Sequence, residues 1–227
     1  VGQARRGGRK GGVGGIPPRP GEYKKRGWLP YWGFCSKNIR TSFKKPRQVL
    51  KFMDTPTKIL SDEHKNILEV IDALLKECDV LKSGKEINKD FFKKAIGFVR
   101  GYADKFHHAK EEDILFVELS KKEGEMHCNP ISQMLAEHDM GRNFIKELEK
   151  GIEENNRNKI IDNARGYSYL LKDHIFKEDN ILYPMADEAL GQEAKKIMLD
   201  KFEKVGREFS AENEKHLFFL KELAERK

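Results

Sequence analysis

After position 54, apolar residues recur at the three- and four-residue spacing of amphipathic helices over most of the chain. Thr55 and Pro56 supply a helix cap and a first-turn proline, and the pattern behind them predicts a first helix to about Leu81. Asn88 can cap a second helix that runs to about Lys122. The pattern therefore predicts two long helices joined by a short loop.

The same signals occur again in the second half of the chain. Asn129 and Pro130 predict the start of a third helix, which gives way to a polar stretch after Gly151. A fourth helix is predicted from about residue 158 to residue 190, and Gly191 separates it from a last amphipathic segment. We expect an all-α protein. Residues 53–190 should form an up-down four-helix bundle, and residues 191–227 an additional C-terminal helix packed on it.

Charge is distributed unevenly along the chain. Residues 1–52 contain 14 Lys and Arg and one acidic residue, Glu22, which gives 14 − 1 = +13, and the rest has 30 basic and 36 acidic residues, which gives −6. This arm is rich in Gly, Pro and Arg and has no apolar period, so we expect it to be disordered or, because Met53 directly precedes the first helix, not part of the native product. Only the arm is basic, so a nucleic-acid partner is not expected.

Cysteine usage and hydropathy indicate a cytoplasmic protein. The three cysteines, Cys35, Cys78 and Cys128, form neither a disulfide framework nor a Cys-x-x-Cys metal pair, which fits a reducing compartment. No stretch reaches the roughly 18 apolar residues of a membrane span. We therefore expect no membrane partner.

An internal repeat carries the candidate chemistry. The second helix contains HHAKEEDILFV, which begins at His107, and the fourth contains HIFKEDNILYP, which begins at His174. Without gaps, His107 aligns with His174 and Glu111 with Glu178. The first and third helices each contribute a Glu-His pair, which ends in His64 and His138. Each half of the bundle thus supplies one histidine and then a His-x-x-x-Glu pair.

The helical period places these residues on the apolar faces of their helices. His107 and Glu111, four residues apart, share a stripe with Phe92 and Ile96. The alternative pair, His108 and Glu112, aligns with glycines and charged residues, so we expect it on a polar face. The predicted inward-facing metal ligands are His64, His107, Glu111, His138, His174 and Glu178.

Burying six such side chains without a partner would be costly, and a bound cation removes that cost. A single histidine on an apolar face is more often a hydrogen-bonded core residue, but a duplicated set on four successive helices favours a metal site. Four imidazoles and two carboxylates are too many for one tetrahedral zinc, and no cysteine takes part. Two octahedral iron ions account for them well.

With these motifs, residues 55 to about 190 resemble the hemerythrin-like (HHE cation-binding) family. The resemblance implies a four-helix bundle around an oxo- or hydroxo-bridged di-iron centre whose ligands are the six residues named above. In one position the chain departs from the family's oxygen carriers, because Arg142 stands where they have a further histidine. Asp179 matches the carriers' aspartate, which leaves Glu178 and Asp179 as alternatives, although the repeat favours Glu178.

The resemblance implies a non-haem di-iron protein that binds dioxygen or nitric oxide for storage, delivery or sensing, and we expect a binding protein rather than an oxidoreductase. The alternatives are a di-iron enzyme that acts on nitric oxide, peroxide or dioxygen, an iron-handling or iron-centre repair protein, and a helical interaction module without metal. The last alternative predicts complete folding in the absence of iron. The sequence does not identify a protein redox partner.

Overall fold

Local capping determines where the predicted helices begin. In the computed structural model, which describes residues 55–122 and 129–225, the Thr55 side chain accepts a hydrogen bond from Lys58 N at 3.1 Å, and Asn88 and Asn156 cap the second and fourth helices in the same way. The first helix ends at Lys82, and Gly84 lies in the turn that follows, where its φ of +92° suits a residue without a side chain. The arm predicted for residues 1–52 lies outside the described residues.

Every regular element among the described residues is a helix, which confirms the predicted fold class. The second helix is one continuous run of α-helical and π-helical turns. In chain order, the first half contains α1 (Pro56–Lys82), α2 (Lys89–Phe98), the π-helical η2 (Val99–His108) and η3 (Glu111–Leu115), and α3 (Phe116–Ser120).

The second half follows the same plan and then adds the C-terminal segment. It contains α4 (Ile131–Glu153), α5 (Arg157–Lys177), the π-helical η5 (Glu178–Leu182), α6 (Tyr183–Ala189), α7 (Gln192–Glu208) and α8 (Ser210–Glu225). The single C-terminal helix that the sequence predicts is thus divided in two, near Phe209.

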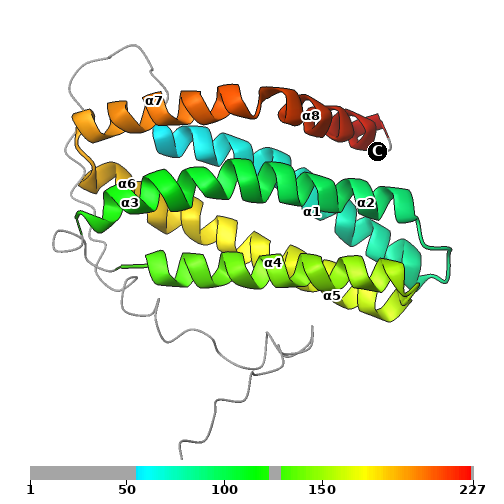
Figure 1. Ribbon diagram of the computed structural model, residues 1–227. Helices are drawn as coiled ribbons and strands as arrows, with labels where there is room; N and C mark the ends of the chain where they lie inside the picture. The colour runs from blue at the N-terminus through cyan, green and yellow to red at the C-terminus, as the bar shows by residue number, and fades with distance from the viewer. Residues whose placement is uncertain (1–54, 123–128, 226–227) are drawn as a thin grey trace, which may run out of the picture.

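The four long helices run side by side, with α4 against α5 and α1 against α5. The helices α7 and α8, orange to red in Figure 1, lie along α1 and the second helix. The α8 helix approaches the second helix closely at Gly101, which has no side chain. A Cβ at this position would lie only 2.2 Å from Nε2 of His216 on α8. The C-terminal helices therefore cover one side of the bundle.

The apolar core consists of two clusters, with a layer of polar side chains between them. On α1, Leu60 belongs to one cluster and Ile67 to the other, and His64 lies between. On α4, Met134 and Phe144 flank His138 in the same way. Each cluster anchors all four long helices, so the rigid apolar packing on both sides positions the polar layer.

Within the described residues, none of the helices combines the length and the apolar character that crossing a lipid bilayer requires.

Candidate metal centre

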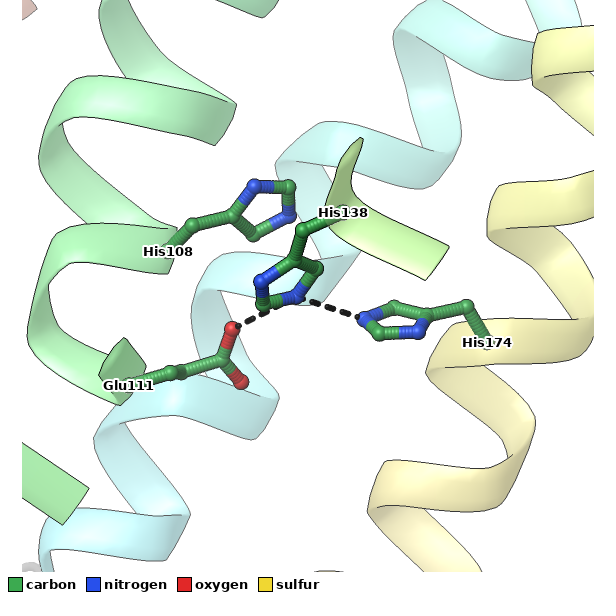
Figure 2. Close-up of side chains that lie close together, drawn as sticks. All are labelled: His108, Glu111, His138 and His174. Carbon is green, nitrogen blue, oxygen red and sulfur yellow. Dashed lines mark hydrogen bonds and ion pairs between the residues drawn. The ribbon is translucent and has the colours of Figure 1, made fainter. Parts of the chain in front are cut away.

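The structure brings all six predicted ligands together in the polar layer. Each of them exposes 1% or less of its surface. Two groups of side chains could each hold one cation, and in each group the potential ligand atoms lie within 4.8 Å of one another. The first group is His64, His107, Glu111 and Glu178, and the second is His108, Glu111, His138 and His174 (Figure 2).

The two glutamates connect the groups. For Glu178, Oε2 lies 3.3 Å from His64 Nε2 and Oε1 lies 3.1 Å from His174 Nε2. For Glu111, Oε1 lies 3.6 Å from His107 Nε2 and Oε2 lies 3.5 Å from His138 Nε2. Each carboxylate thus presents one oxygen to each pair of histidines. This is the arrangement that two bridging carboxylates would adopt between two metal ions.

The central carboxylate oxygens supply a further sign of a cation site. Oε2 of Glu111 and both oxygens of Glu178 are buried and have no hydrogen-bond partner among the described residues. Buried polar atoms without partners are rare, and buried carboxylates are normally paired or bound to a metal. The mixed imidazole and carboxylate donors therefore fit two metal ions of the class that includes iron.

A carboxylate orients each of the four predicted histidines from behind. Their Nδ1–H groups donate to carboxylates at 2.6 to 3.0 Å, so Nε2 faces the centre, where the Nε2 atoms of His138 and His174 lie 2.9 Å apart. The pairs are His64 with Asp179, His107 with Glu63, His138 with Glu112 and His174 with Glu137. The structure thus places Asp179 and Glu112 behind the histidines and Glu178 and Glu111 inside the groups.

Two lysines hold two of these outer carboxylates, the ones behind His107 and His174, in place. Lys110 pairs with Glu63, and Lys177, which aligns with it in the repeat, pairs with Glu137. The two pairs differ in their surroundings, because the Lys110 side chain is 2% exposed and that of Lys177 is 18% exposed. The Lys110 ammonium lies 3.5 Å from the centre of the Phe106 ring and is covered by Phe202 of α7. The two lysine-carboxylate pairs are therefore chemically equivalent, but Lys110 is more deeply buried than Lys177.

The expectation that His108 lies on a polar face is wrong. His108 is only 6% exposed, and its ring stacks on that of His138 at 3.8 Å between centroids. Two causes explain the difference. The second helix packs against both α1 and α4, so its buried arc is wider than one stripe, and η2 has the wider π-helical turns rather than the assumed α-helical period. His108 therefore belongs to the second group. It lines the same cavity as Arg142, the residue at the position where the oxygen carriers have a further histidine.

The metal-free centre holds protons that cations would displace. Burial lowers the pKa of His64, but the hydrogen bond to Asp179 and the charge of Glu178, whose Oε2 lies 3.3 Å from Nε2, outweigh it and raise the pKa to about 9. His174 responds in the same way, since burial is outweighed by the Glu178 charge and the Glu137 hydrogen bond, and its pKa is about 10. Burial and the Glu178 charge both raise the pKa of Glu111 well above its ordinary value.

The two groups have different neighbours. On the side of the first group, the Tyr183 hydroxyl donates a hydrogen bond to Glu111 Oε1 at 2.5 Å and lies 3.4 Å from His64 Nε2. Beside the second group, Arg142 binds Glu112, Asp104 and Asp139, so it lies over the carboxylate that orients His138. The centre thus has an engaged tyrosine on one side and an arginine network on the other.

Sequence reasoning named the six residues of the centre, but it did not place any carboxylate behind the histidines, and it named His108, Glu112 and Asp179 only as alternative ligands. The outer partners had a recognisable signal. Glu63, Glu112, Glu137 and Asp179 each stand next to a candidate ligand in the sequence. The doubled histidine at positions 107 and 108 was the corresponding signal for His108.

Comparison with known proteins agrees with this geometry. Residues 55–186, more than half of the chain, match the family model described as Hemerythrin HHE cation binding domain. Neither the comparison with curated proteins nor that with solved structures gave a match. The matched range contains both groups of candidate ligands, which confirms the resemblance inferred from the repeat. With its buried histidine and glutamate groups, the chain belongs to the hemerythrin HHE cation-binding domain family.

Proposed function

We propose that this protein binds two iron ions in the polar layer and uses them to bind a small diatomic ligand, dioxygen or nitric oxide, for storage, delivery or sensing. The observation that carries the proposal is the position of Glu111 and Glu178. Each presents one oxygen to either histidine pair, at 3.1 to 3.6 Å from the nearest Nε2. Because the two oxygens of each carboxylate lie beside different histidine pairs, these residues would suit two ions better than one.

Iron is the proposed metal because the donors are imidazoles and carboxylates in a helical bundle, without thiolates. When bound, the iron pair would supply the redox chemistry and open coordination positions that a diatomic ligand needs. The chain's own residues hold the donors in place: the outer carboxylates fix each imidazole, and the two apolar clusters exclude water from the layer.

The proposal can be tested by measuring iron content and the visible spectrum of protein purified without oxygen, before and after exposure to air. We expect about two irons per chain and charge-transfer bands that change in air. His174→Ala should lose iron and bands. His216→Ala removes a histidine that lies outside the two groups, so this variant should keep the iron and the bands. One zinc per chain, or equal spectra for the two variants, would contradict the proposal.

One observation favours the alternative function, a di-iron enzyme that acts on nitric oxide, peroxide or dioxygen. A cavity beside the second group has polar side chains in its wall, Asp104, Arg142 and Tyr167 among them, and proton donors near a bound ligand promote turnover. Rates of autoxidation, peroxide consumption and nitric oxide consumption separate the two functions. Slow autoxidation without turnover supports a carrier or sensor, and rapid turnover of any of the three supports the enzyme.

A further inference from the structure

The two halves of the repeat differ at two positions beside the centre. His108 in the second helix aligns with Ile175 in the fourth, and Tyr183 in the fourth helix aligns with Phe116 in the second. His108 belongs to the second group of candidate ligands. Each half thus has one polar side chain where the other half has an apolar one, and in the fourth helix that side chain is a tyrosine.

A π-helical turn brings Tyr183 toward the centre. Its backbone N–H bonds the carbonyl oxygen of Glu178, five residues earlier, and Phe116 makes the same bond to Glu111. In an α-helix, two residues five positions apart point in directions that differ by about 140°. The wider π turn reduces this angle, so Tyr183 lies on the inner side of its helix together with the carboxylate that precedes it.

The rings at the two aligned positions pack in the same way. The Tyr183 ring stacks on that of His64, with 5.5 Å between centroids and 10° between planes. The Phe116 ring stacks on that of His138, with 6.2 Å and 16°. Both aromatic residues are 3% exposed. Packing alone therefore accounts for an aromatic ring at position 183 but not for its hydroxyl group.

The Tyr183 hydroxyl lies among the donor atoms of the first group. Its oxygen is 2.5 Å from Glu111 Oε1 and 3.4 Å from His64 Nε2. Both distances are shorter than the 4.8 Å within which the potential ligand atoms of this group lie. The first group has two imidazoles and the second has three. The phenolic oxygen would therefore give the first group the additional donor that His108 gives the second.

We propose that the phenolic oxygen of Tyr183 is a ligand of the metal ion held by the first group. The inference rests on the proposed di-iron function and deepens it. Tyrosine is one of the side chains that bind iron in proteins. As the metal–oxygen bond forms, the O–H bond breaks and the proton leaves to water, and the oxidation state of the iron does not change. The two iron positions then differ chemically, since one has an anionic oxygen where the other has a neutral imidazole.

Resonance Raman spectroscopy tests this ligand directly. A phenolate bound to ferric iron has a charge-transfer band in the visible range, and excitation in this band enhances the vibrational modes of the tyrosine ring. The spectra compare air-oxidised wild type, Tyr183→Phe and Tyr167→Phe, all loaded with two irons per chain. Tyr167 is the matched control, because it is 2% exposed and its hydroxyl has no hydrogen-bond partner among the described residues.

We expect enhanced ring modes in wild type and in Tyr167→Phe, and their loss in Tyr183→Phe. Ring-deuterated tyrosine should shift these modes in wild type, so the unmodified sequence alone shows whether a tyrosine binds iron. Tyr183→Phe should fold, because phenylalanine at position 116 has the equivalent packing.

The affinity for iron provides a second readout. The loss of an outer partner of a metal ligand costs about 10- to 100-fold in metal affinity, so the loss of a direct ligand should weaken one iron position by about tenfold or more. In competition with a chelator, Tyr183→Phe should therefore release one iron before the other, whereas Tyr167→Phe should retain both irons as wild type does.

The outcomes separate the two proposals. Wild-type protein without an iron pair overturns the di-iron function, and the tyrosine ligand falls with it. Wild type with two irons but without enhanced tyrosine modes overturns the ligand alone, and this is the result that a tyrosine serving only to hold Glu111 in place would give. Ring modes that persist in Tyr183→Phe or vanish in Tyr167→Phe, or equal iron affinity of Tyr183→Phe and wild type, also overturn the ligand.

Discussion

The unequal covering of the two lysine-carboxylate pairs leads to a sharp prediction about stability. Replacing Glu63 by Gln leaves the Lys110 ammonium without a charged partner in a site where its side chain is 2% exposed and faces aromatic rings. Breaking a buried ion pair in this way costs about 3–5 kcal/mol. Replacing Glu137 by Gln leaves Lys177, which is 18% exposed and can reach water, so we expect a loss of only up to about 1 kcal/mol.

The two variants should nevertheless affect metal binding alike. Each removes the carboxylate charge behind one histidine, His107 or His174, and such changes typically cost 10- to 100-fold in metal affinity. The two substitutions should therefore give similar metal affinities but different stabilities of the metal-free protein. This combination separates the role of the carboxylate toward the histidine from its role toward the lysine.

Urea denaturation of the metal-free variants, followed by circular dichroism, measures the free energy of unfolding. The double variant Glu63→Gln/Lys110→Met should be more stable than Glu63→Gln alone, because it replaces the stranded charge with an apolar side chain among Phe106 and Phe202. Equal losses for Glu63→Gln and Glu137→Gln, or a double variant less stable than the single one, would refute the reasoning.

Two further predictions follow from the site and the packing. Near pH 7, iron should displace the protons held by His64 and His174, whose pKa values are about 9 and about 10, so metal affinity falls as pH falls. Release of fewer than one proton per chain in a weakly buffered titration would contradict this. Gly166→Ala places a Cβ 2.5 Å from the Phe144 ring and should cost about 1–3 kcal/mol in urea denaturation, whereas Gly97→Ala, with nothing within 4 Å, should stabilise the protein by up to about 1 kcal/mol; equal shifts would contradict this.

The helices could be predicted because their signals are local. Thr55, Asn88 and the residues around Asn156 cap their helices through hydrogen bonds to backbone groups three residues away, so the sequence contains both partners. The six inner residues were predicted for a related reason. The helical period shows whether a histidine lies on the apolar face of its own helix. The repeat shows the same placement in both halves of the chain.

What the sequence did not reveal depends on neighbours that are distant along the chain. His108 is buried because α4 covers that side of its helix. The spacing of residues within one helix does not show where another helix will pack. The different covering of Lys110 and Lys177 depends on α7, which begins at Gln192, after the repeat has ended. The cavity beside the second group likewise arises from three separate helices.

The hydrogen bonds behind the histidines determine when the centre can be completed during synthesis. His64 is held by Asp179, 115 residues further along the chain, and the first group also requires Glu178. The second group requires His174. Since a ribosome extends the chain from the N-terminus, neither metal position is complete until almost the whole matched domain has emerged. We therefore expect metal uptake to follow synthesis, and nascent chains that stop before residue 174 to retain no metal pair.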